Sequence, residues 1–249
     1  MNSTTVRPRR HDVRSTFTSG PVALLLLSGV GRSLDVKQLR RALLICLGCL
    51  GSLSQPAWSA TSQSYEFKVF LGEQEIGYQR FDVSSQGEQT RVQVDAQFEV
   101  KFFYITFYKY RHTNIEKWES ACLREIRSQT EDNGDAYFVN GTFEKGQLQV
   151  QTKAGNWSGE DCIKTFAYWD PEWITGERLL NSQTGELLPV SIRSIGEETI
   201  SVQGIPTRTT RRQIATDEFT VDLWYTHNGR WVALQSTTTD GDILRYVLQ

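Results

Sequence analysis

The stretch TRVQVDAQFEVK, residues 90–101, decides the fold class because apolar and polar side chains alternate along its whole length. The apolar residues from Val92 to Val100 would point to one side of an extended chain, and the charged and amide residues between them to the other. A period of two residues is typical of a β-strand with one buried and one solvated face. The same alternation recurs in YEFKVFL (65–71), EFTVDLWY (218–225), RWVALQS (230–236) and DILRYVLQ (242–249).

Turn-forming residues separate these runs at short intervals, for example HNG at 227–229 and DGD at 240–242. Asn, Asp and Gly adopt tight-turn conformations readily, so neighbouring strands should pair as antiparallel hairpins. The spacing leaves little room for helices and predicts roughly ten to twelve strands. We therefore expect an all-β protein whose antiparallel meander forms an open or half β-barrel.

One segment, DPEWITGERLLNSQTGELLPV at 170–190, departs from this pattern. Asp170 can cap a short helix, Pro171 suits the first turn of that helix, and Gly176 can end it. Because strands resume on both sides, we interpret the segment as a short helical insertion near residues 169–184. The insertion would belong to a single β-domain covering residues 61–249.

Residues 1–60 are expected to form an N-terminal extension and a signal peptide. From Val36 a basic stretch is followed by an apolar run at 42–53 and then by small residues, which is the layout of a secretory leader. The apolar run is shorter than the roughly 20 residues of a membrane span. Cleavage is predicted after Ser59 or Ala60, which would place the mature protein in the periplasm. A leader seldom has so long a preface, so we favour Val36 as the true start, with a genuine extension as the alternative.

The charge of the chain argues against nucleic acid as a partner. Residues 1–60 hold 8 of the 27 basic and 2 of the 29 acidic side chains, so the rest of the chain holds 19 and 27 and has a net charge of −8. An acidic protein is repelled by a phosphate backbone.

Cys122 and Cys162 are the cysteines that remain after residue 60. In an oxidising compartment such a pair is expected to form a disulfide. The alternative is a reactive thiol, for which the sequence offers no neighbouring base.

No catalytic or metal-binding constellation stands out, and no cofactor is predicted. His112 and His227 are interpreted as surface or hydrogen-bonded residues, because no cysteine or carboxylate lies at a zinc-ligand spacing from them. Asp161, Asp170 and Glu172 form an acidic cluster around Trp169 that could serve general acid–base chemistry. Such carboxylates more often cap turns or face water. A non-catalytic protein is favoured, with an envelope hydrolase that uses this cluster as an alternative.

The run FFYITFYKY, residues 102–110, is the strongest lead to a binding site, because six of its nine residues are aromatic. In one extended strand both faces would carry rings and both should be covered. One face would join the core, while the other would present Tyr104, Tyr108 and Tyr110 to an apolar cavity partly closed by the insertion with Trp169. The alternative is that the insertion fills this space and the rings are structural.

Several short segments resemble a family of exported proteobacterial β-proteins known only as a domain of unknown function. The likeness runs from about Tyr65 to Leu248. It rests on GYQRFDV (77–83), KYRHTNIEKW (109–118), TEDNG (130–134), FAYWDP (166–171), LLNSQTGELLPV (179–190), VDLWY (221–225), GRWVAL (229–234) and ILRYVLQ (243–249). The family has no established activity, so the resemblance assigns no catalytic residue. It implies an antiparallel sheet similar to those of periplasmic lipoprotein carriers.

Together these observations predict a periplasmic protein that binds a lipid, another apolar or amphipathic small molecule, or an envelope protein partner. An outer-membrane β-barrel is a further alternative, because its strands also alternate. REIRSQTED (124–132) is polar on both faces, and a lipid-facing strand would not be.

Overall fold

The computed structural model describes residues 60–102, 105–159, 162–238 and 241–249. These residues belong to one compact unit, 56–249, whereas the predicted signal peptide and Val36 lie outside the described part of the chain. No stretch of the described residues forms a helix able to cross a membrane. The fifteen strands in the described ranges are β1 (Thr61–Leu71), β2 (Gln74–Gln86), β3 (Gln89–Phe102), β4 (Ile105–Glu119), β5 (Cys122–Asp132), β6 (Asp135–Glu144), β7 (Gln147–Thr152), β8 (Gly155–Gly159), β9 (Arg178–Leu180), β10 (Leu187–Pro189), β11 (Ser191–Val202), β12 (Ile205–Ala215), β13 (Phe219–Thr226), β14 (Trp231–Thr238) and β15 (Ile243–Leu248).

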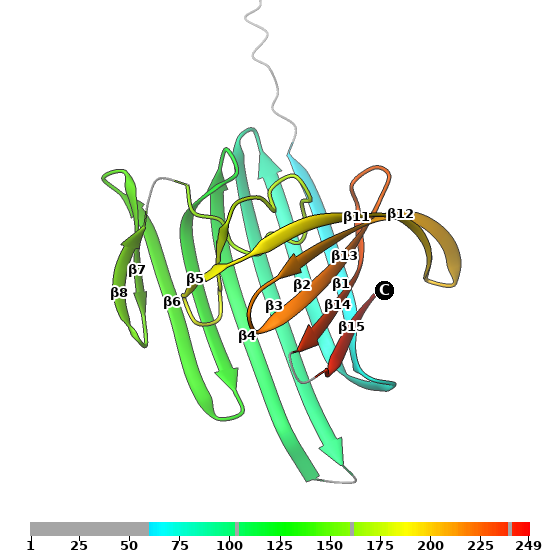
Figure 1. Cartoon of the computed structure of the whole chain (residues 1–249). Coiled ribbons are helices and arrows are strands. Elements are labelled where there is room, and N and C mark those ends of the chain that lie inside the picture. The colour runs from blue at the N-terminus through cyan, green and yellow to red at the C-terminus, as the bar shows by residue number, and fades with distance from the viewer. Residues whose placement is uncertain (1–59, 103–104, 160–161, 239–240) are drawn as a thin grey trace, which may run out of the picture. The chain divides into compact units, whose positions relative to one another are not determined.

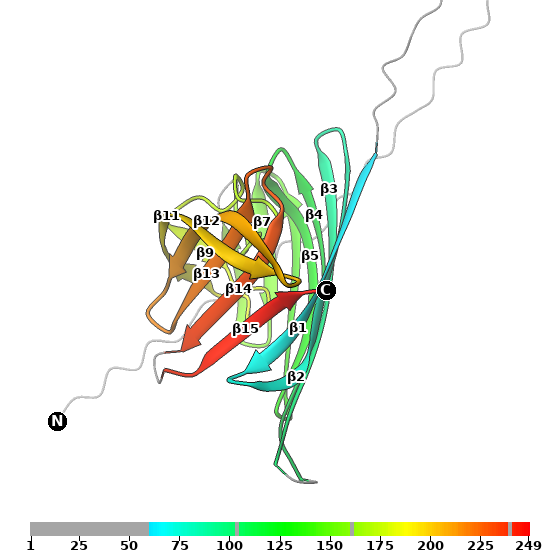
Figure 2. The same ribbon diagram turned by 90° about the vertical axis from the view of Figure 1, so that its right-hand side faces the viewer.

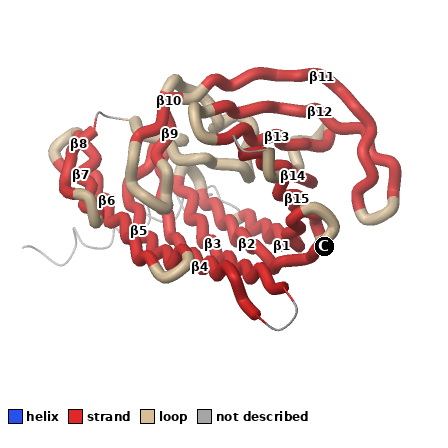
Figure 3. Tube along the Cα trace, turned by 60° about the horizontal axis from the view of Figure 1, so that its bottom comes forward, coloured by secondary structure: helices blue, strands red, loops and turns tan. Residues whose placement is uncertain are grey.

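Thirteen of these strands form one antiparallel meander, ordered β11-β12-β13-β14-β15-β1-β2-β3-β4-β5-β6-β7-β8. The first and last strands of the described chain are neighbours, since β1 pairs with β15. The two edge strands, β8 and β11, do not pair with each other, so the sheet is open. Seen end-on it has the outline of a C, with β1–β8 as one wall and β11–β15 bent over it (Figures 1 and 3). The expected all-β, open meander is confirmed, with more strands than the sequence suggested.

The alternation of apolar and polar residues along β3 places the apolar side chains on the inner face of the sheet, as the sequence of residues 90–101 predicts. Val92, Val94, Ala96 and Phe98 are buried, while Arg91 and Gln93, on either side of Val92, are exposed. The exposed face carries cross-strand ion pairs such as Arg80–Glu66 at 3.1 Å. The sheet therefore has one apolar, concave face and one solvated face.

Residues 162–190, which we call the plug, cross the concave side between β8 and β11. The small β9–β10 ladder belongs to the plug (both strands in Figure 3, β9 in Figure 2). Ile163, Ala167, Ile174 and Leu180 of the plug are buried in the same core cluster as residues from both walls of the sheet.

The predicted helical insertion is wrong, because the described residues contain no helix. Asp170 does cap a turn: its carboxylate accepts the Glu172 N–H at 2.9 Å, and its carbonyl accepts the Trp173 N–H at 3.2 Å. The turn does not continue, because Gly176 follows almost at once with φ of +113°. A single turn is too short to offset the cost of starting a helix. Trp173 instead packs on Trp118, with ring centroids 5.3 Å apart.

The aromatic run is not one strand either. Phe102 ends β3 and pairs with Ile105, which begins β4, so the chain reverses direction within the run. The β3–β4 hairpin extends beyond the neighbouring strands (Figure 1), and Phe107 on its outer face is 59% exposed. The expectation that rings on both faces would be covered is therefore wrong for Phe107. Tyr104 lies outside the described residues.

Candidate functional site

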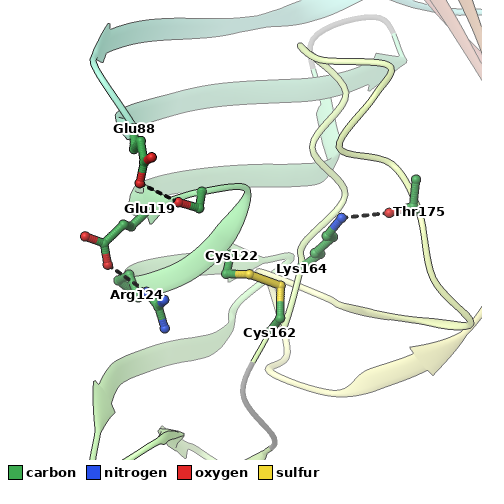
Figure 4. The surroundings of a disulfide bond; sticks show 8 residues. Glu88, Glu119, Cys122, Arg124, Cys162, Lys164 and Thr175 are labelled. Carbon is green, nitrogen blue, oxygen red and sulfur yellow. Dashed lines mark hydrogen bonds and ion pairs between the residues drawn. A yellow bond between two sulfur atoms is a disulfide. The ribbon is translucent and has the colours of Figure 1, made fainter.

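A disulfide fixes the beginning of the plug to the sheet. Cys122, the first residue of β5, is bonded to Cys162 with a Cα–Cα distance of 4.9 Å (Figure 4). This distance lies in the ordinary range for disulfides. Beside the bond the Leu123 N–H donates to the Ile163 carbonyl at 2.9 Å. The disulfide expected from the two cysteines is present in the structure.

Hydrogen bonds from both walls hold the rest of the plug. Trp157 Nε1 on β8 donates to the Gly185 carbonyl at 2.9 Å, and the Tyr225 hydroxyl on β13 donates to the Tyr168 carbonyl at 2.8 Å. The plug also pairs with itself, since the Leu180 N–H donates to the Lys164 carbonyl at 2.8 Å. It is thus a fixed part of the fold.

A row of polar side chains on the inner face of β4 meets the plug. The alternation of KYRHTNIEKW turns Tyr110, His112, Asn114, Glu116 and Trp118 inward. His112, Asn114 and Glu116 are all buried, which is unusual for residues of this polarity. Buried polar groups require partners, so their contacts determine what this region can do.

Glu116 is the centre of the row and is only 2% exposed. Its Oε1 accepts a hydrogen bond from Asn114 Nδ2 at 2.8 Å. Its Oε2 accepts two, from Trp118 Nε1 at 2.9 Å and from Thr165 Oγ1 of the plug at 3.2 Å. Burial raises the pKa of Glu116, and the three donated hydrogen bonds oppose that rise. The carboxyl group thereby joins β4 to the plug.

His112 is held neutral at ordinary pH. Its Nδ1 lies 2.8 Å from Thr130 Oγ1 on β5. Burial lowers the pKa of His112 to about 4, because a charged imidazolium would lose its hydration.

A cavity of about 230 Å³ lies between this row, the plug and strands β13–β15. Its deep wall contains the buried side chains of Asn114, Glu116 and Trp169. Half-buried residues, among them Gln183 and Tyr246, also belong to the lining. The lining contains both aromatic rings and polar side chains, so the cavity is amphipathic.

Two atoms of the deep wall lack a hydrogen-bond partner among the described residues: Asn114 Oδ1, an acceptor, and Trp169 Nε1, a donor. Asn114 is 3% and Trp169 6% exposed. A buried polar atom without a partner costs about 1–3 kcal/mol. Both residues line the same cavity, but these two atoms are themselves almost completely buried, so the residues contact the cavity through their other atoms.

The structure brings two of the four predicted ligand-binding residues, Tyr110 and Trp169, to this cavity. The Tyr110 hydroxyl donates to Gln183 Oε1 at 3.3 Å, and Gln183 Nε2 donates to Asp132 at 3.1 Å. Tyr108 is half-buried but is not in the lining; burial and a hydrogen bond to Asp132 raise its pKa.

The acidic cluster does not form a shared site among the described residues. Asp170 caps its turn, and Glu172 pairs with Arg212 at 3.1 Å. Asp161 lies outside the described part of the chain. Among the described residues, no group of three or more His, Cys, Asp or Glu side chains is placed to hold a metal ion.

Fold and cavity define an open antiparallel β half-barrel with an internal plug. Residues 67–249 match the family model of a domain of unknown function, DUF6134, and the chain belongs to this family. A solved structure with a similar fold is the β-barrel-like protein of the domain of unknown function DUF1849 from Brucella abortus. It has a TM-score of 0.56 and 10% sequence identity, and the match covers 76% of this chain and 95% of that one. No curated protein matches the chain.

Proposed function

We propose that this protein is an exported, non-catalytic binding protein that holds a small amphipathic molecule between the concave sheet and the plug. The observation that carries the proposal is the cavity itself, whose lining combines aromatic rings such as Tyr110 and Trp169 with polar side chains such as Asn114 and Gln183. A fold that needed only a solid interior would fill this space with apolar side chains.

A binding role fits the titratable groups of the cavity better than catalysis does. Both oxygens of Glu116 already accept hydrogen bonds from within the protein. His112 is neutral, and its Nδ1 faces Thr130. Proton transfer needs a group within reach of the substrate whose pKa is close to the working pH. The pKa of His112 is too low for this role, and both oxygens of Glu116 are engaged by donors of the protein itself.

The volume limits the size of the ligand. About 230 Å³ is below the roughly 300–1,000 Å³ of pockets for drug-sized ligands. We therefore propose a smaller molecule with polar groups as the ligand, in place of the lipid expected from the sequence. The rigid plug, tied to β5 by the disulfide, supports a preformed site.

The leader-like segment before Ala60 and the disulfide between the two remaining cysteines support export to the periplasm. N-terminal sequencing of protein from a periplasmic extract tests this part of the proposal. We expect the mature chain to begin at Ala60 or Thr61; a full-length cytoplasmic product would refute export.

Native mass spectrometry of protein purified from the periplasm under mild conditions tests binding. We expect a population heavier than the polypeptide by the mass of one small molecule, which is lost under denaturing conditions. If the native mass equals that of the polypeptide in every preparation, and no added small molecule binds, the binding role is wrong.

A further inference from the structure

We infer that the ligand of this cavity is a small quaternary ammonium compound, in which a trimethylammonium group carries a short polar tail. The inference rests on the proposed binding function and specifies its ligand class. Two features of the lining carry it: a buried carboxyl group without a counter-charge, and aromatic side chains on several sides of the space.

The carboxyl group of Glu116 has no positive partner. Its three hydrogen-bond donors, on Asn114, Trp118 and Thr165, are all neutral groups. None of the described residues lining the cavity is Lys or Arg, and His112 is neutral because its pKa is lowered to about 4. Burial raises the pKa of Glu116, and no cation of the described protein opposes that rise. A buried carboxylate without a positive partner is costly, so a cation in the cavity would supply the missing charge.

The hydrogen bonds of Glu116 select the kind of cation. A primary ammonium group has three N–H donors that need acceptors, but both oxygens of Glu116 already accept hydrogen bonds from the protein. A metal ion would need several oxygen ligands, and the described residues contain no group of three or more side chains placed to hold one. A quaternary ammonium group has no N–H and needs no acceptor. It is attracted to the carboxylate by charge alone, and in a buried site this attraction acts over several ångströms.

Aromatic rings form much of the lining. They come from β3, β4, the plug, β13 and β15, and include Phe98, Tyr110, Tyr168, Phe219 and Tyr246. Phe98 and Tyr246 meet at an interplanar angle of 84°, with centroids 6.3 Å apart, so the rings are adjoining walls and not a single flat stack. The faces of aromatic rings attract cations, most strongly where water is excluded, and aromatic cages recognise quaternary ammonium groups in this way.

The volume agrees with a compact ligand. A cavity of about 150 Å³ binds benzene, which has six non-hydrogen atoms. By the same proportion, about 230 Å³ accommodates on the order of nine. Choline, a trimethylammonium group with a hydroxyethyl tail, is within this size. The polar side chains of Gln79 and Gln183 in the lining suit its hydroxyl group.

The test is calorimetric titration of the ligand-free mature protein at pH 8 with three probes. Choline is compared with 3,3-dimethylbutan-1-ol, which has the same shape but carries carbon in place of the charged nitrogen, and with ethanolamine, which is a primary ammonium. We expect choline to bind at least tenfold more tightly than either of the other two. Native mass spectrometry of the protein from the periplasm should release a quaternary ammonium compound.

Two variants localise the effect. Glu116→Gln removes the charge but keeps the shape of the side chain, and should weaken binding of choline about tenfold more than binding of the uncharged probe. Asp222→Asn is the matched control, because it also removes a buried carboxylate. Asp222 pairs with Arg211 at 2.9 Å and is not in the cavity lining, so this variant should bind choline as the wild type does.

The failures are distinguishable. If choline binds no better than 3,3-dimethylbutan-1-ol, or if the native protein releases a molecule without a quaternary ammonium group, the inference is wrong and the binding role stands. If no probe binds and no molecule is released, the cavity holds only water and both proposals are wrong. Equal loss of choline binding in both variants would overturn the assignment of Glu116. The comparison of probes on the wild type does not depend on the folding of either variant.

Discussion

Replacing Glu116 with leucine should destabilise the protein by about 3 kcal/mol. The change leaves three donors without their acceptor: Asn114 Nδ2, Trp118 Nε1 and Thr165 Oγ1. At about 1–3 kcal/mol for each unsatisfied donor the gross cost is roughly 3–9 kcal/mol. Burying leucine returns about 1.5–3 kcal/mol, and Asn114 and Thr165 can turn toward the cavity and its water. In a domain of this size the net loss corresponds to a fall of roughly 6–12 °C in Tm.

Glu116→Gln is the matched control, because it keeps the shape and one acceptor oxygen. That oxygen can serve Trp118 and Thr165, while the new amide N–H group can donate to Asn114 Oδ1 once the Asn114 amide turns over. We expect the stability of the Glu116→Gln variant to lie within about 1 kcal/mol of the wild type at neutral pH.

The pH dependence of the same variant gives an independent check. The pKa of Glu116 is raised in the folded state above its ordinary value of 4.5. Above that value the unfolded chain releases a proton that the folded protein retains, so the wild type loses stability as the pH rises toward the folded pKa. The stability of Glu116→Gln relative to the wild type should therefore increase from pH 4.5 upward.

Urea unfolding of the three proteins at several pH values, with the disulfide intact, measures these differences. Equal stability of Glu116→Leu and Glu116→Gln would refute the proposed cost, because the three donors would then not depend on the carboxyl group. A difference between Glu116→Gln and the wild type that does not vary with pH would refute the raised pKa.

The remaining predictions concern His112, the disulfide and a glycine of the plug. The pKa of His112 falls from 6.5 to about 4 on folding, so the folded protein binds fewer protons; its contribution of about 3 kcal/mol should be complete above pH 6.5 and lost as the pH falls toward 4. Urea unfolding of His112→Gln should show a flatter acid limb, and an unchanged slope would contradict this. Replacing both Cys122 and Cys162 with serine opens a loop with a separation of 40 residues and should cost about 4 kcal/mol in the chain-entropy model; a reductant should destabilise the wild type equally and leave the variant unchanged. Gly185 has φ of +80°, and an added Cβ would lie 2.3 Å from a methyl group on β7, so Gly185→Ala should cost about 3 kcal/mol. Gly146→Ala, with φ of +81° and nothing within 4 Å, should cost only about 1–2 kcal/mol, and equal losses in denaturant unfolding would refute the packing argument.

The class of fold could be predicted from sequence because its signal is local. In residues 90–101 the side-chain period equals the pleat of a strand, so Val92 to Phe98 share a face wherever the strand is placed. The disulfide could be predicted from the cysteine count after residue 60, since Cys122 and Cys162 can pair in one way.

The plug could not be predicted, because its conformation is set by distant partners. Asp170 does cap a turn, but the ring of Trp173 packs on Trp118 of β4. The segment therefore does not continue as a helix. The aromatic run misled for a related reason: residues 102–110 do not reveal that the chain reverses between Phe102 and Ile105. Ring content alone does not distinguish one strand from the two arms of a hairpin.

The polar row on β4 was missed because hydrophobicity points to the wrong face. A prediction based on hydrophobicity places Ile115, the clearest aliphatic residue of 110–118, on the buried face. Alternation along the strand would then bury Arg111 and Lys117 with it. The better signal lies on the opposite face. Its two ends are the aromatic residues Tyr110 and Trp118, and the side chains between them are shorter than those of Arg and Lys. That face is buried because its polar side chains have partners. Thr165 of the plug donates to Glu116, and Thr130 of β5 is hydrogen-bonded to His112. A row of apolar side chains would pack against the plug equally well in several positions, whereas directional hydrogen bonds select a single position of the plug. Within the cavity lining this requirement is left unmet at Asn114 Oδ1 and Trp169 Nε1, which have no hydrogen-bond partner among the described residues.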